Sequence, residues 1–203
     1  MYLGAITGDL VVTNNTVKGV TQSDGIYVTD NSASPVVTGN TVDAIGRDGI
    51  SINGGSNAQV NGNWIGLGAD HALGGAGLNA DSTIGRDGIR IVNAAYSEAN
   101  SNKIAHTSGN GIFVDPSPFS HINFNTVKDF GVNSSGILLE EGDDSEILGN
   151  SVTGNDGAAQ SGIKVTDSDR VQVGEGAGGG VNRNTINKVG TGIAVVGGSA
   201  VTV

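Results

Sequence analysis

The stretch VVTGNTVDAIGRDGISI, residues 36–52, contains two short runs of apolar residues joined by a glycine-containing corner. Similar stretches return at residues 121–139 (HINFNTVKDFGVNSSGILL) and 146–165 (EILGNSVTGNDGAAQSGIKV). Within each run the apolar residues tend to alternate, which is the period of a β-strand, because successive side chains point to opposite faces. The recurrence indicates one structural unit that is used several times along the chain.

Two sequence motifs recur in every unit and allow the units to be counted. The first is a Gly-Ile pair followed by alternating apolar residues, with its glycines at Gly25, Gly49, Gly88, Gly111, Gly136, Gly162 and Gly192. The second is an asparagine two residues before Val or Ile, at Asn15, Asn40, Asn63, Asn102, Asn125, Asn150 and Asn184. The glycine-to-asparagine spacing is 14 or 15 residues except once, and the asparagine-to-glycine spacing is 8 to 12 residues except once.

These spacings predict an all-β fold, a parallel β-helix (solenoid) of about seven turns of 23–26 residues. The whole chain, 1–203, is expected to form this single array, with corner insertions at about 66–85 and 174–180. The right-handed sense follows the general preference of parallel crossovers. Because parallel strands stack about 4.8 Å apart, equivalent residues of successive turns should form ladders. The asparagines are interpreted as a structural ladder of corner amides that donate to and accept from their neighbours.

The composition limits the function. The 203 residues include 35 glycines, no cysteine and 4% aromatics, and the formal net charge is −10. The acidic balance argues against a nucleic-acid partner, and the lack of cysteine rules out disulfides and thiolate zinc sites. No apolar run approaches the length of a membrane span, so no membrane insertion is expected. No cofactor is predicted, and Ca²⁺ bridging to acidic groups is left open.

The Gly-Ile and Asn pattern resembles the repeat of the right-handed parallel β-helices of the pectate-lyase-like superfamily, over nearly the whole chain. Residues 63–79 (NWIGLGADHALGGAGLN) and 171–186 (VQVGEGAGGGVNRNTI) also resemble insertions in long, repetitive bacterial surface proteins of this type. The resemblance implies a secreted or cell-surface bacterial protein and a carbohydrate ligand. Because repeat material reaches both ends, the chain is expected to be a fragment whose partners include neighbouring β-helix turns of a parent protein.

In the resembled enzymes the strands after the Gly-Ile pairs form the floor of a substrate groove. The outward positions there place Asp115 and Glu140 one turn apart, as candidate catalytic carboxylates. Such a pair could hydrolyse glycosides, bind Ca²⁺ or support proton abstraction beside a uronate carboxyl group, and it could also be a solvated charged face. The candidate substrate-binding residues around the pair are Arg90, Phe113, Lys164, Glu141 and Asp167.

The motifs of the resembled enzymes are incomplete in this sequence. No Gly-His-Gly exists, and an epimerase-like Asp-Pro-His is reduced to Asp115-Pro116 followed by Ser117. The three histidines, His71, His106 and His121, lack nearby partners for a metal site.

The pentapeptide Gly-Arg-Asp-Gly-Ile occurs twice, at 46–50 and 85–89. Arg47 should therefore stack near Arg86, and Asp48 near Asp87. The favoured interpretation is structural, with each aspartate capping its corner and each arginine pairing with a stacked aspartate. The alternative is a clamp for an anion.

Together these features favour an extracellular structural or adhesin-like β-helix module that contacts polysaccharide through its groove face. The alternative is a polysaccharide-active enzyme, a lyase, glycoside hydrolase or uronate epimerase, that uses acidic residues of the central turns.

Overall fold

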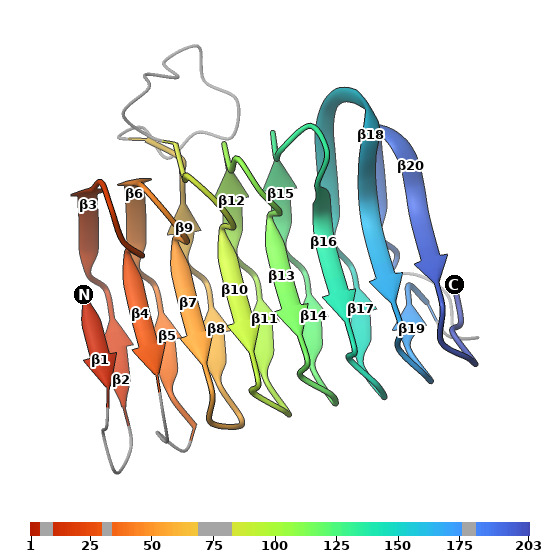
Figure 1. Ribbon diagram of the computed structural model, residues 1–203, viewed down its shortest axis with the longest axis horizontal. Helices are drawn as coiled ribbons and strands as arrows, with labels where there is room; N and C mark the ends of the chain where they lie inside the picture. The colour runs from red at the N-terminus through yellow and green to blue at the C-terminus, as the bar shows by residue number, and fades with distance from the viewer. Residues whose placement is uncertain (5–9, 30–33, 69–82, 176–181) are drawn as a thin grey trace.

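The computed structural model describes residues 1–4, 10–29, 34–68, 83–175 and 182–203. These residues form a solenoid in which every turn passes through the same three faces (Figure 1). Among the described residues all strand pairs are parallel, and each strand pairs with the equivalent strand of the next turn. The fold is the predicted parallel β-helix.

The first face carries one strand that precedes the first Gly-Ile pair and the strands that contain the isoleucines of these pairs. They are β1 (Tyr2–Gly4), β4 (Ile26–Thr29), β7 (Ile50–Asn53), β10 (Ile89–Val92), β13 (Ile112–Asp115) and β16 (Ser135–Glu140). The second face is a seven-stranded sheet of β2 (Val11–Thr13), β5 (Val36–Thr38), β8 (Gln59–Asn61), β11 (Glu98–Asn100), β14 (His121–Asn123), β17 (Glu146–Leu148) and β19 (Gln172–Val173).

The third face follows the asparagines. It contains β3 (Thr16–Val20), β6 (Thr41–Ile45), β9 (Trp64–Ile65), β12 (Lys103–Ala105) and β15 (Thr126–Lys128). Two long strands, β18 (Ser151–Thr166) and β20 (Thr185–Val196), run through the corner from the third face into the first and join these faces into one 13-stranded sheet. The seven strands of the second face enclose six complete turns between β2 and β19, slightly fewer than the expected seven.

The core is a stack of aliphatic side chains, as the repeated isoleucines predict. The register pairs Ile26 with Ile50, Ile50 with Ile89 and Ile89 with Ile112, and all four are fully buried. Aliphatic residues from the other two faces, such as Val60, pack into the same core. Each turn therefore covers the apolar residues of the turn before it.

The glycine of the Gly-Ile pair is required by the corner where the first and third faces meet. A Cβ added to Gly49 would lie 2.6 Å from the Gly88 carbonyl oxygen and 2.6 Å from Ile65 Cγ2. Gly25 is equally crowded, by the Gly49 oxygen and the Val42 side chain at 2.6 Å. The turns can keep their spacing at this corner only if the residue has no side chain.

The seven asparagines form one continuous ladder. From Asn15 onward, the Nδ2 of each asparagine donates to the Oδ1 of the next at 3.0–3.1 Å. The backbone N–H of Asn102 donates to the same Asn125 Oδ1 at 2.9 Å, and Asn102 Nδ2 also donates to the Val60 carbonyl at 2.8 Å. Because Asn102 is fully buried, these bonds satisfy polar groups that water cannot reach.

Residues 69–82 and 176–181 lie outside the described part of the chain, so most of each predicted insertion (66–85 and 174–180) lies there as well. Among the described residues no helix is long and apolar enough to cross a bilayer.

Candidate functional site

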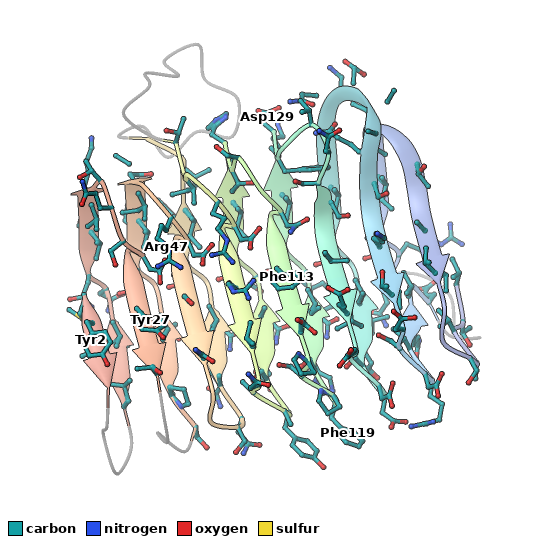
Figure 2. All side chains as sticks on the ribbon, viewed as in Figure 1. Tyr2, Tyr27, Arg47, Phe113, Phe119 and Asp129 are labelled. Atoms are coloured by element: carbon teal, nitrogen blue, oxygen red, sulfur yellow. The ribbon has the colours of Figure 1, made fainter. Side chains whose placement is uncertain are left out.

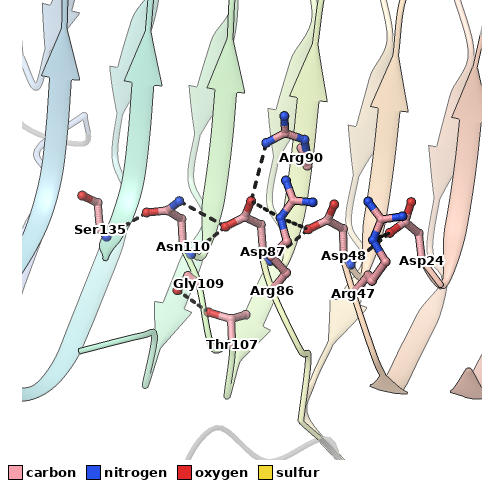
Figure 3. A network of polar contacts seen from close by, with 10 residues as sticks. All are labelled: Asp24, Arg47, Asp48, Arg86, Asp87, Arg90, Thr107, Gly109, Asn110 and Ser135. Carbon is pink, nitrogen blue, oxygen red and sulfur yellow. Dashed lines mark hydrogen bonds and ion pairs between the residues drawn. The ribbon is translucent and has the colours of Figure 1, made fainter. Parts of the chain in front are cut away.

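A second ladder runs under the start of the first-face strands. It consists of Asp24, Asp48, Asp87 and Asn110, the residues immediately before four of the Gly-Ile pairs, and we call it the Asx ladder. The N–H of Asp48 donates to Asp24 Oδ1 at 3.2 Å, and the N–H of Asp87 donates to Asp48 Oδ1 at 3.1 Å. The ladder continues through Asn110 and then to the N–H of Ser135 (Figure 3).

Three arginines lie over the Asx ladder, and we call Arg47, Arg86 and Arg90 the arginine row. Nε of Arg47 is 3.6 Å from Asp24 Oδ1, and Nε of Arg86 is 3.5 Å from Asp48 Oδ1. Arg90 Nη1 is 3.8 Å from Asp87 Oδ2. Arg47 and Arg86 thus each pair with the aspartate of the preceding turn, as the structural interpretation of the repeated pentapeptide predicts.

The arginine row and the Asx ladder differ in their exposure to solvent. The side chains of Arg47 and Arg86 are 52% and 42% exposed, whereas those of Asp24 and Asp48 are 5% and 1% exposed. The ion pairs are therefore oriented, with carboxylates facing the protein and guanidinium groups facing solvent. On a chain with a net charge of −10, this strip presents positive charge outward.

Burial changes the proton affinity of two aspartates in the Asx ladder. It raises the pKa of Asp48 from 3.8 to about 6, against the lowering effects of the Asp87 N–H and Arg86. The neighbouring carboxylates of Asp87 and Asp24 raise this pKa further. Burial also raises the pKa of Asp87, although hydrogen bonds from Asn110 and the charge of Arg86 oppose the shift. Asp48 is thus a buried group that takes up a proton as the pH falls through about 6.

The outward side of these turns forms an open pocket of about 400 Å³. Tyr2 and Tyr27 stand next to each other at one side, with ring centroids 5.5 Å apart and planes tilted by 42° (Figure 2). Asn53 Nδ2 donates to the Tyr27 hydroxyl at 3.4 Å. The pocket is lined by Tyr2, Ser23, Asp24, Tyr27, Arg47, Asp48, Ser51, Asn53, Arg86, Arg90 and Val92. It combines apolar ring surface, amide and hydroxyl groups, and exposed cations.

The predicted carboxylate pair lies outside this pocket lining. The register of β13 against β16 pairs Val114 with Leu139, so the next residues, Asp115 and Glu140, lie on adjacent turns. Both are partly exposed. Burial raises the pKa of Asp115, and the positive charge of Arg90 opposes the shift. The two carboxylates are therefore neighbours on the outer side of the first face.

Phe113, predicted as a substrate-binding residue, is largely covered. Its side chain is only 8% exposed, and the guanidinium carbon of Arg90 lies 4.6 Å from its ring centroid. Arg90 therefore contacts both Asp87 and Phe113 and lies near Asp115. Tyr2 was not predicted as part of a site, because it precedes the first Gly-Ile pair. The register of Tyr2 against Tyr27 places it on the first face.

The other predicted contacts occupy later turns. Lys164 lies beside Leu138 on the next strand and is separated from Arg90 by the two turns of Phe113 and Leu138. Glu141 and Asp167 lie in left-handed turns just after their strands, at φ 48° each. Their N–H groups donate to the carbonyls of the next turn, those of Thr166 and Val196. The structure thus spreads the predicted groove residues along the central turns.

Other polar residues of interest have structural partners or lie on other faces. The fully buried Ser117 accepts a hydrogen bond from the Ala94 N–H at 3.0 Å, so the residue in place of the epimerase-like histidine supports a turn. His121 is exposed on the second face. His106 Nδ1 is 3.7 Å from Asp129 Oδ2, and burial lowers the pKa of His106 against the opposing charge of Asp129.

His71 lies outside the described residues. Within the described ranges, no group of three His, Asp or Glu side chains is placed to hold a metal ion.

The comparisons with known proteins concern the fold. The family model of the right-handed β-helix region matches residues 5–177, which supports the predicted handedness. No curated protein sequence matches the chain. Among solved structures, the A-module of Azotobacter vinelandii mannuronan C-5 epimerase AlgE6 is 16% identical, with a TM-score of 0.53 over 98% of this chain and 59% of that chain.

Two further structures have lower TM-scores. The A-module of epimerase AlgE4 from the same organism is 13% identical, with a TM-score of 0.47 over 98% of this chain and 57% of that chain. The Dettilon tailspike protein is 13% identical, with a TM-score of 0.35 over 94% of this chain and 54% of that chain. The chain spans less than two thirds of each of these three structures. At such identities the likeness shows the fold alone.

Proposed function

Because the chain belongs to the family of right-handed β-helix proteins, we propose that it is a polysaccharide-contacting β-helix module of an extracellular or cell-surface protein. The observation that carries this proposal is the open pocket over β1, β4, β7 and β10, where Tyr2 and Tyr27 adjoin the arginine row. A polysaccharide is an elongated ligand, and the first face is an elongated parallel sheet that continues on one side of this pocket.

The chemistry of the pocket suits sugar rings. Tyrosine offers an apolar ring and a hydroxyl group, which matches the mixed surface of a pyranose. Arg47 and Arg86 offer donors for hydroxyl or carboxylate oxygens, and Asn53 and Ser51 add groups that both donate and accept. The pocket is built on adjacent strands of a rigid ladder, so ligand binding requires little ordering of the protein.

A second candidate function is a polysaccharide-active enzyme, a lyase, glycoside hydrolase or uronate epimerase. It is favoured by the position of Asp115 and Glu140 on adjacent turns and by the burial that raises the pKa of Asp115. The residues around this carboxylate pair argue against an enzyme. Arg90 covers Phe113, and Ser117 serves a turn where an epimerase-like histidine would stand.

A panel of polysaccharides, scored for retention and for product release in the same samples, tests both candidates. We expect retention without product, weakened about tenfold by Tyr27→Ala and unchanged by Asp115→Ala/Glu140→Ala. Tyr96→Ala is the control, because Tyr96 is an exposed tyrosine that lies outside the pocket lining. Product that disappears in the double variant would establish the enzyme instead. Absence of both retention and product from every polymer would reject the polysaccharide proposal.

A further inference from the structure

We propose that the arginine row binds an anionic group of the polysaccharide, a carboxylate or a sulfate, and that Asp48 takes up a proton when this group binds. The inference rests on the proposed function, because it assigns the charge of the ligand and the regulation of the same pocket. Two anions, one from the ligand and one from the protein, would otherwise compete for the guanidinium group of Arg86.

The geometry of Arg86 sets up this competition. Its Nε lies 3.5 Å from Asp48 Oδ1 and 3.9 Å from Asp87 Oδ2, so two buried carboxylates already approach one cation. The same side chain lines the pocket and is 42% exposed, which makes it accessible to a ligand from the other side. A carboxylate or sulfate at Arg86 would therefore add a third negative charge to one guanidinium group.

Asp48 is better suited than Asp87 to lose its charge. Asp87 Oδ1 accepts hydrogen bonds from Asn110 N at 2.7 Å and from Asn110 Nδ2 at 3.1 Å, and Arg90 lies 3.8 Å from its other oxygen. Asp48 Oδ1 accepts one bond, from the Asp87 N–H at 3.1 Å, besides its contact with Arg86. Because Asp48 has fewer donors than Asp87 to stabilise its negative charge, protonation of Asp48 requires less free energy than protonation of Asp87.

Ligand binding shifts the balance of the charged groups that face Asp48 toward its protonated form. Asp24 from the preceding turn and Asp87 from the next turn disfavour its negative charge, and Arg86 favours it. Arg47, next to Asp48 in sequence, is paired with Asp24. An anion on Arg86 screens the one cation that favours ionised Asp48. The pKa of Asp48, about 6 in the free protein, should therefore rise on binding.

The ladder itself supplies the test variant. Asn110 occupies the position equivalent to Asp48, accepts the N–H of the next turn through Oδ1 and donates Nδ2 to the aspartate before it. Asp48→Asn can form the same bonds, accepting from Asp87 and donating to Asp24. It is a permanently uncharged equivalent of protonated Asp48 that should fold normally. Asp144→Asn is the control, because Asp144 pairs with Arg170 outside the pocket lining.

The experiment measures the affinity of the wild-type chain and both variants at pH 5, 6, 7 and 8 for a polyuronate, a sulfated galactan and a neutral glucan. We expect the wild type to bind an anionic polymer about tenfold more weakly at pH 8 than at pH 5, because binding takes up a proton. Asp48→Asn should keep the pH 5 affinity at every pH, and Asp144→Asn should follow the wild type. The two anionic polymers distinguish a carboxylate ligand from a sulfate ligand.

The outcomes separate this inference from the function on which it rests. Binding to an anionic polymer with no pH dependence, or with the same dependence in Asp48→Asn, would overturn the proton coupling alone. Binding to the neutral glucan as tightly as to both anionic polymers would overturn the assignment of an anionic ligand. Failure of all three polymers to bind would reject the proposed function and this inference with it.

Discussion

Replacing Asp48 by asparagine should make the protein more stable at neutral pH and leave its stability unchanged in acid. The side chain of Asp48 is 1% exposed, and its pKa rises from 3.8 to about 6 on folding. A group whose pKa is raised in the folded state supports folding below its unfolded pKa, and this support disappears as pH rises through the folded pKa. The window is therefore from about pH 4 to about pH 6.

The size of the effect follows from the shift. About two pKa units correspond to about 3 kcal/mol, the approximate free energy required to keep Asp48 ionised in the folded state above pH 6. Asp48→Asn removes this penalty and keeps the hydrogen bond to the Asp87 N–H. We therefore expect the free energy of unfolding of the variant to exceed that of the wild type by up to about 3 kcal/mol at pH 8, and to equal it near pH 4.

Urea unfolding of the wild type and the variant at pH 4, 6 and 8 measures this difference directly. The stability advantage of the variant should increase with pH and level off above pH 6. A variant that is less stable than the wild type at pH 8 would refute the reasoning, because the ion pair with Arg86 would then outweigh burial. A difference that is independent of pH would refute it as well.

Three further substitutions test the ladders and the corner. Asn102→Ala should lower the free energy of unfolding by about 4 kcal/mol, since it removes the acceptor of the buried Asn63 N–H and the side-chain donor to the Val60 carbonyl; a loss below about 1 kcal/mol in urea unfolding would contradict this. Gly49→Ala should cost about 1–3 kcal/mol or prevent folding, because its Cβ meets the Gly88 oxygen; an unchanged thermal midpoint would contradict it. Asn110→Asp should lower the thermal midpoint at pH 8 but not at pH 4, because it puts a second carboxylate against Asp87; equal losses at both pH values would indicate a steric cause.

The sequence was sufficient to predict the parallel β-helix because the fold repeats its requirements in every turn. A buried amide must bond to the turns above and below, so Asn102 and its equivalents return at a fixed spacing. The reason for the glycine of the Gly-Ile pair became evident only from the structure. At Gly49 it is the close approach of the Gly88 carbonyl, which depends on how two faces meet.

The candidate site was harder to predict because it depends on side-chain contacts that do not repeat. The outward position of Arg90 follows from strand alternation, but its contact with the Phe113 ring does not, and this contact removes Phe113 as an open surface. The pairing of Arg47 and Arg86 with buried aspartates was indicated by the repeated pentapeptide. Tyr2 carries no repeat motif, so only the strand register places it in the pocket.

The most direct test of the polysaccharide-contact proposal is to map where the glycan protects the backbone from hydrogen exchange. The wild-type chain would be measured with and without the polymer that it retains. We predict slower exchange in residues 23–29, 47–53 and 86–92, which contribute most of the pocket lining, and unchanged exchange in residues 138–141 and 164–167. Protection confined to residues 113–115 and 138–141 would contradict the account and place the ligand over Asp115 and Glu140.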